Sequence, residues 1–201
     1  EGSDLEGQVD LRLSLAGAWK APRVDAEMSF DQVTMTLPVT YQKLHQFGGK
    51  IRFDGRYLEI ENLAGQLDDG RFAIGGRAEI AGRELQAANL SFEARALPLA
   101  LPDTLDLKLD SDLRLDGSPT AARLHGNVML LEGLYYKDVR LNLFKAATTR
   151  RRAQAPPAAA APNPALDAVA LDLRIGRRQP FYVSNNLADL QLAPDLQVGG
   201  T

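Results

Sequence analysis

The chain has 201 residues and a nearly neutral charge, with 23 Lys and Arg against 26 Asp and Glu. This balance, without a basic face interleaved with aromatic residues, argues against a nucleic-acid partner. A hydrophobic content of 45% excludes disorder of the whole chain. The chain contains no cysteine, which excludes thiol chemistry. Its two histidines, His45 and His125, are too few for us to expect a histidine metal centre or a catalytic triad. We expect a folded protein that is not an enzyme and that needs no metal or cofactor.

The sequence contains no recognisable targeting signal or membrane-spanning segment. No run of 18 apolar residues occurs, no basic and then apolar leader opens the sequence, and the first residue is Glu1. We therefore expect a soluble piece of a longer protein, and any anchor or signal to lie outside this piece.

Most of the chain alternates between apolar and polar residues. Such alternation places apolar side chains on one face of a strand and polar ones on the other, as in antiparallel sheets with one wet face. The clearest segments are residues 11–15, 24–30, 105–109, 113–116, 139–143 and 169–175. Glu84–Arg95 is helix-friendly in composition, yet Leu90, Phe92 and Ala94 alternate, which favours a strand. Tyr41, Leu44 and Phe47 instead recur at helical spacing and predict a short helical turn.

Turn signals separate these segments regularly. Asp54-Gly55, Asp69-Gly70 and Asp116-Gly117 are dipeptides typical of tight hairpins, whose central residues need positive φ. Strands of about six residues, joined by such turns, predict a long meander.

An internal repeat has an offset of 100 residues. Leu13, Leu15 and Gly17 recur as Leu113, Leu115 and Gly117, and the strands that follow them also match. A third copy begins at Asp195. Repetition of this kind indicates solenoid-like stacking, in which each unit covers its neighbour.

One segment, Ala146–Pro164, is rich in Ala and Pro and has no periodicity. This composition predicts a disordered loop. We therefore divide the chain into a repetitive sheet (1–145), a loop (146–165) and a continuation of the same sheet (166–201). The triplet Arg150–Arg152 within this loop either contacts anionic lipid headgroups or is simply solvated.

Motifs for chemistry are not found. An acidic loop beginning at Asp112 has the glycine of a calcium-binding loop, but Arg114 and Arg123 occupy ligand positions, so no metal site is predicted. No phosphate-binding loop, dinucleotide fingerprint or nucleophile elbow occurs, and no pair of carboxylates stands out. We expect both histidines to be structural or exposed rather than catalytic.

Several strings, in their order, resemble the TamB family of Gram-negative bacteria. These strings are Gly48–Gly55, Leu58–Ile60, Leu63–Gly65, Gly70–Gly76, Leu124–Val128, Glu132–Tyr136, Val183–Asn186, Ala188–Leu190 and Asp195–Thr201. The resemblance implies an all-β fold, curled into a taco-shaped or U-shaped groove with an apolar inner face and few or no helices. It also implies a periplasmic protein anchored in the inner membrane, with an outer-membrane barrel, TamA, as partner and no catalytic residues.

The implied role is to carry phospholipid between the two membranes through contact with the acyl chains, in support of outer-membrane biogenesis. From alternation alone, the residues expected to line such a groove are Leu13, Met28, Phe53, Ile60, Phe72, Ile74, Leu107, Leu109, Leu115, Leu141, Leu171, Leu173 and Val183. A second hypothesis is a scaffold or chaperone, whose sheet edge pairs with outer-membrane β-barrel proteins such as autotransporters during their assembly. A third is a carbohydrate-active or adhesive β-sandwich, whose apolar faces form a dry core.

Overall fold

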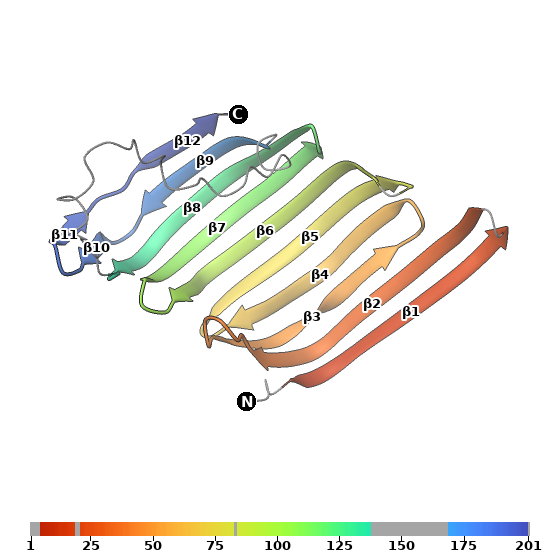
Figure 1. The fold of residues 1–201 in the computed structure, drawn as a ribbon, viewed down its shortest axis with the longest axis horizontal. Coiled ribbons are helices and arrows are strands. Elements are labelled where there is room, and N and C mark those ends of the chain that lie inside the picture. The colour runs from red at the N-terminus through yellow and green to blue at the C-terminus, as the bar shows by residue number, and fades with distance from the viewer. Residues whose placement is uncertain (1–4, 19–20, 83, 138–168, 201) are drawn as a thin grey trace, which may run out of the picture.

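The protein is a single β-sheet in the computed structural model, which describes residues 5–18, 21–82, 84–137 and 169–200 (Figure 1). No helix occurs in these ranges, and so none that could cross a membrane. The strands are β1 (Glu6–Ala18), β2 (Ala21–Thr36), β3 (Lys43–Phe53), β4 (Tyr57–Leu67), β5 (Gly70–Ala81), β6 (Glu84–Leu101), β7 (Leu105–Ser118), β8 (Ala121–Tyr135), β9 (Val169–Arg177), β10 (Phe181–Ser184), β11 (Asp189–Leu192) and β12 (Leu196–Gly200). The all-β, open and curled architecture expected from the sequence is confirmed.

The sheet is an antiparallel meander from β1 to β8, in which every strand pairs with its neighbours in the sequence. The pattern then changes, because β9 and β10 both run parallel to β8 and lie one after the other along its edge. β11 and β12 pair antiparallel with β10 and β9, respectively, and complete the sheet. A parallel pair needs a long connection, and residues 136–168 separate β8 from β9. The meander predicted for the whole chain is therefore mixed at its C-terminal end.

Bulges in the strands bend the sheet. Gln32 in β2, Gln46 in β3, Asn62 in β4 and Ala96 in β6 all have φ near +50°, and each lies where the strand pairing shifts register. A bulge adds one residue to its strand and increases the local twist, so bulges in successive strands make a wide sheet curl. A Cβ at Gly49 would overlap the backbone of the Asn62 bulge, so this glycine allows the close approach.

The β2–β3 loop, residues 37–42, folds back over one end of the sheet. The Gln42 side chain is buried, and its Nε2 donates to the Pro98 carbonyl (2.8 Å) and to Asp68 Oδ2 (3.1 Å). The Ala100 backbone N–H donates to Gln42 Oε1. Leu37 in the same loop packs against a buried cluster of Leu67, Ala94 and Leu97. The loop thus joins the start of β3 to β6 across β4 and β5.

The strand predicted over Glu84–Arg95 is confirmed as part of β6, whereas the helical turn over Tyr41–Phe47 is wrong. β3 begins at Lys43, and the bulge at Gln46 lets Leu44 and Phe47 share a face although they are three residues apart. A bulged strand therefore imitates the spacing of a helix.

The three predicted hairpin dipeptides have different outcomes. Asp54-Gly55 lies in the β3–β4 turn, with Gly55 at φ +88°. Asp69 lies in the β4–β5 turn, but there the positive φ belongs to Asp68, and Gly70 starts β5. The prediction for Asp116-Gly117 is wrong, because both residues lie inside β7 and the turn falls two residues later. Gly117 instead allows close approach to the Ala121 carbonyl.

Candidate functional site

One face of the sheet, which we call the inner face, is built from rows of apolar residues that run across the strands. The strand pairing places one row on ten strands, and it contains Leu11, Met28, Ile51, Ile60, Gly76, Leu90, Leu115, Leu124, Leu171 and Gly200. A second row contains Leu63, Ile74, Phe92, Leu113, Gly126, Leu173 and Val198. Neither row includes a charged residue, so the inner face is apolar across the width of the sheet.

The inner face is only partly buried. Among the described residues the buried hydrophobic ones are Val33, Leu63, Leu67, Ala78, Ala94 and Leu97, and no large side chain is fully buried. On β1, Leu11 and Leu13 are 63% and 62% exposed. A dry sandwich would bury such residues against a second sheet, and all described strands belong to one sheet. This contradicts the sandwich hypothesis for the described residues.

All but one of the residues predicted to line a groove lie on the inner face. The strand pairing places there Leu13, Met28, Phe53, Ile60, Phe72, Ile74, Leu107, Leu109, Leu115, Leu171, Leu173 and Val183. The remaining residue, Leu141, lies outside the described residues, as does the whole predicted loop with Arg150–Arg152. Contact of these side chains with lipid stays a prediction.

An aromatic group on the inner face was missed by the sequence reasoning. Phe47 lies edge-on to Phe30, with ring centroids 5.2 Å apart, and is 6.2 Å from Phe72. β4 lies between β3 and β5, and there Gly65 leaves room for the Phe47 ring. A glycine flanked on both neighbouring strands by phenylalanine was the available signal, but the helical assignment of Phe47 hid it.

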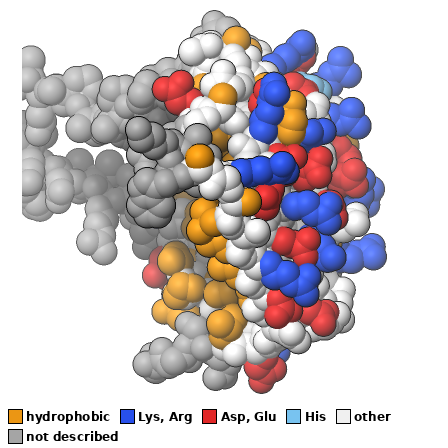
Figure 2. Space-filling view, turned by 90° about the vertical axis from the view of Figure 1, so that its right-hand side faces the viewer, with side chains coloured by type: hydrophobic (Ala, Val, Ile, Leu, Met, Phe, Trp, Pro, Cys, Tyr) orange, Lys and Arg blue, Asp and Glu red, His pale blue; other side chains and the backbone are white. Residues whose placement is uncertain are grey.

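The opposite, outer face carries the charges. Figure 2 shows Lys, Arg, Asp and Glu side chains crowded along one side of the sheet. Arg52 contacts Glu27 (3.5 Å) and Glu61 (3.1 Å), and Arg95 contacts Asp112 (3.0 Å). These pairs cross between neighbouring strands and are solvent-exposed, so each contributes at most about 1 kcal/mol. Their main effect is to keep the outer face hydrated.

Two carboxylates on the outer side have lowered pKa values. The backbone N–H groups of Tyr57 and Arg56 donate to the Asp54 carboxylate in the β3–β4 turn, which lowers its pKa. Lys108 Nζ lies 2.5 Å from Asp69 Oδ2, and this hydrogen-bonded ion pair lowers the pKa of Asp69 and raises the pKa of Lys108. Both effects stabilise turns rather than prepare a reactive group.

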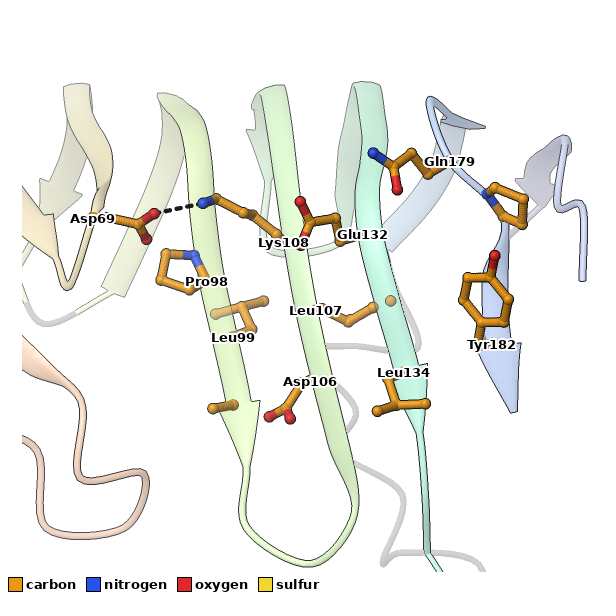
Figure 3. A pocket seen from close by; sticks show the side chains of 13 residues that line it. Asp69, Pro98, Leu99, Asp106, Leu107, Lys108, Glu132, Leu134, Gln179 and Tyr182 are labelled. Atoms are coloured by element: carbon orange, nitrogen blue, oxygen red, sulfur yellow. Dashed lines mark hydrogen bonds and ion pairs between the residues drawn. The ribbon is translucent and has the colours of Figure 1, made fainter. Parts of the chain in front are cut away.

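A hollow of about 440 Å³ interrupts the outer face near the ends of β6, β7, β8 and β10 (Figure 3). Its lining includes Pro98, Leu134 and Tyr182, together with the Lys108–Asp69 pair. Sequence reasoning missed it, although the continuous apolar run of residues 96–102 was a signal that both faces of β6 are apolar there.

The structure places the two histidines apart, His45 in β3 and His125 in β8. The described residues contain no group of three or more His, Asp or Glu side chains arranged to hold a metal ion. Nε2 of His45 lies 2.8 Å from the Asp68 carbonyl, and Nδ1 of His125 lies 3.6 Å from Asp116 on the outer face. His45 therefore contacts the β4–β5 turn, and His125 lies beside Asp116 of β7 without a hydrogen bond at Nδ1 within the described residues.

Comparisons with known proteins identify a family model and a relative that match this chain. Residues 61–201 match the family model of the TamB C-terminal domain. The chain is 25% identical over 134 residues to protein TIC236, chloroplastic, from Arabidopsis thaliana, which covers 66% of this chain and 6% of that protein. The chain thus spans a small part of that relative's length. No solved structure matches the chain significantly.

Proposed function

Because this chain belongs to the TamB family, we propose that its inner face binds the acyl chains of phospholipids and lets them move across the strands, as part of a route between two membranes. Family membership indicates a protein of a membrane envelope. The periplasm, an anchor in the inner membrane and TamA as a partner belong to this proposal. No residue is given a catalytic role.

The observation that supports this proposal is an apolar face that spans the sheet and has no cover among the described strands. Monomeric proteins rarely expose large contiguous apolar surface without a partner for it. Acyl chains gain about 0.8 kcal/mol per buried methylene, or roughly 10 kcal/mol for a fully buried long chain. An open face covers one side of an acyl chain, so the free energy gained on binding is smaller than this limit. A smaller gain favours release of the lipid as well as its binding.

The rows of the inner face also suit movement. Leucine, isoleucine, phenylalanine and glycine follow one another from strand to strand without a charge or a buried polar pair that would hold a lipid at one position. Binding free energy is therefore similar from row to row, and a lipid meets no deep trap.

Photo-crosslinking in the full-length protein tests the proposal. A photoreactive amino acid at Phe72, Leu107 or Leu171 on the inner face should give phospholipid adducts in mass spectrometry. The same group at Arg52 or Arg174 on the outer face should not. Equal labelling from both faces overturns the proposal. Adducts with unfolded outer-membrane β-barrel proteins, in place of lipid, support the chaperone hypothesis instead.

A substitution on β9 gives the functional readout. Leu171→Asp puts a carboxylate on a partly buried position of the uncovered inner face, where water can still reach it, so the sheet should fold while lipid binding in native mass spectrometry falls several-fold. Arg174→Asp, on the outer face of the same strand, is the matched control and should leave lipid binding unchanged. Full lipid binding by folded Leu171→Asp contradicts the proposal.

A further inference from the structure

The hollow on the outer face has more negative than positive side chains in its lining. The charged ones are Asp69, Asp106, Lys108 and Glu132, so three carboxylates against one ammonium leave a net charge of −2. Lys108 is already paired with Asp69 at 2.5 Å. Glu132 helps to raise the pKa of Lys108 through its charge, but neither Glu132 nor Asp106 forms a hydrogen bond or ion pair with a described residue. Both carboxylates are therefore available to a cation from outside the sheet.

The walls between these carboxylates are apolar (Figure 3). Ala100 of β6 and Leu134 of β8 lie opposite Asp106 on either side, and Tyr182 of β10 is opposite Leu134. Leu134 and Tyr182 are 38% and 48% exposed, so the hollow is open to solvent. Its volume of about 440 Å³ lies in the range of ligand sites, about 300–1,000 Å³. A ligand of matching chemistry therefore has a positive charge on an apolar stem.

Elsewhere on the sheet, an arginine of the chain itself occupies a site with the same kinds of side chain. Arg77 of β5 lies over the ring of Tyr57, with its guanidinium carbon 3.6 Å from the ring centroid. The same guanidinium contacts Glu59, two residues after Tyr57 on β4, at 3.6 Å. An arginine placed over an aromatic ring and beside a carboxylate gains from cation–π attraction as well as from charge. The hollow also has a tyrosine and carboxylates, but none of the described residues that line it is an arginine.

Asp106 and Glu132 are placed so that one guanidinium can pair with both. Asp106 is opposite Leu134 and Glu132 is opposite Lys108, so the two carboxylates occupy diagonal positions on neighbouring strands. Diagonal neighbours in an antiparallel pair lie about 7–8 Å apart. A guanidinium has several N–H donors in a planar fork and can donate on two sides, whereas an ammonium is a compact point charge. The arrangement therefore favours arginine over lysine.

We propose that the hollow binds an arginine side chain from a segment of a partner protein. The guanidinium pairs with Asp106 and Glu132 and lies over Tyr182. The hydrocarbon stem contacts Pro98 and Leu134. The net negative charge disfavours partners that present phosphate, such as lipid headgroups and nucleic acids. This inference does not depend on whether the inner face binds lipid.

The open shape of the hollow favours a side chain over a free small molecule. Small-molecule sites usually enclose about 70–90% of the ligand surface. Here two of the walls remain half-exposed, so a free ligand would keep much of its surface in water. An arginine in a protein segment is held in place by its own backbone as well, and the neighbouring residues of that segment can cover the opening.

The probe for this site is a short peptide with the sequence Ala-Leu-Arg-Leu-Ala and blocked ends. It is titrated into the isotope-labelled 201-residue chain, and NMR shifts of the amides of β8 and β10 report binding. In the control peptide, citrulline replaces arginine, because it has nearly the same shape without the charge. We expect the arginine peptide to bind at least ten-fold more tightly, and its binding to weaken as salt is added. Equal binding of the two peptides, or no binding of either, overturns the inference.

Substitutions in the protein test the named side chains. Asp106→Asn combined with Glu132→Gln removes both charges at nearly constant size and should weaken binding of the arginine peptide at least ten-fold. Tyr182→Leu keeps the wall apolar and should weaken it several-fold. Glu93→Gln, at an exposed position on the outer face of β6, is the matched control and should leave binding unchanged. Unchanged affinity in a double variant that is folded by circular dichroism contradicts the inference.

Other occupants of the hollow give different results. If ethylguanidinium binds as tightly as the peptide, the hollow suits a free small molecule, and the assignment to a protein segment is wrong. If the peptide binds only after Arg150–Arg152 are replaced by serine, arginines of the chain itself compete for the hollow, and the assignment to a partner protein is also wrong.

Discussion

The β1–β2 and β7–β8 hairpins share a register but have different surroundings. Leu11 on β1 is 63% exposed, whereas Ser111, at the equivalent position of β7, is 2% exposed. Among the described strands, β7 has a neighbour on both sides and β1 has a neighbour on one side. The alternating pattern therefore determines which residues pair and which face they share, while burial depends on the neighbours that the fold supplies.

The two hairpins also differ where strands approach most closely. Gly126 of β8 has φ +142°, and a Cβ there would overlap the Asp112 carbonyl. The equivalent residue of β2 is Ala26, which has a side chain at the same register position. The interior hairpin thus requires glycine where the edge hairpin does not.

The largest difference between the hairpins is expected for a valine at this position. Gly126→Val should cost about 3 kcal/mol or more in the free energy of unfolding, because it combines a backbone overlap with a conformation that branched residues avoid. Ala26→Val should change it by less than about 1 kcal/mol. Urea unfolding followed by circular dichroism gives both values. Equal unfolding midpoints for the two variants would show that β8 can move away from β7 at little cost.

A residue exchange between Leu11 and Ser111 should have an intermediate effect. Ser111→Leu forces a larger side chain into the row between Ala94 and Val128 and should destabilise the protein by about 1–3 kcal/mol. Leu11→Ser should cost less than about 0.5 kcal/mol, because the edge position is already hydrated. Thermal unfolding of both variants measures the contrast.

Ser111→Ala is the control for this exchange. The Ser111 hydroxyl is buried and has no hydrogen-bond partner among the described residues, so its removal should be neutral or slightly stabilising. Clear destabilisation by Ser111→Ala would show that the hydroxyl has a partner, and the packing argument for Ser111→Leu would then fail.

The smallest effect concerns position 108, where β7 has a lysine and β1 has Gln8. The ion pair with Lys108 lowers the pKa of Asp69, so its contribution is present above the ordinary carboxyl pKa of about 3.9 and is lost as the pH falls through the folded-state pKa. Lys108→Gln should lower the melting temperature slightly at neutral pH, and this difference should shrink in acid. A difference that is constant from neutral to acid pH contradicts the assignment to this pair.

The sequence was sufficient for the features that depend on periodicity. Alternation along β7 and β9 identified the face on which Leu107 and Leu171 lie, because a strand has a period of two. The repeat at Leu13 and Leu113 indicated hairpins that the structure shows in one register. These signals are local, and the apolar face follows directly from them.

Features that depend on distant neighbours were not accessible in this way. The bulge at Gln46 breaks the period and made Leu44 and Phe47 look helical. The contact of Gln42 with Pro98 joins residues 56 positions apart, and nothing in the local pattern signals it. The parallel pairing of β9 with β8 also depends on a connection whose path the alternation does not encode.

The parallel pairing has a consequence for the order in which the sheet can assemble. From β1 to β8 each strand can pair with the previous one by closing a short connection, so these strands can form the sheet in the order of the sequence. Adding β9 requires closure of residues 136–168, which costs about 2 kcal/mol more in loop entropy than a three-residue turn. Within the described residues β9 to β12 pair with one another and with β8, so we expect them to join the edge of β8 as a group. We therefore expect β1 to β8 to form before β9 to β12 join the sheet.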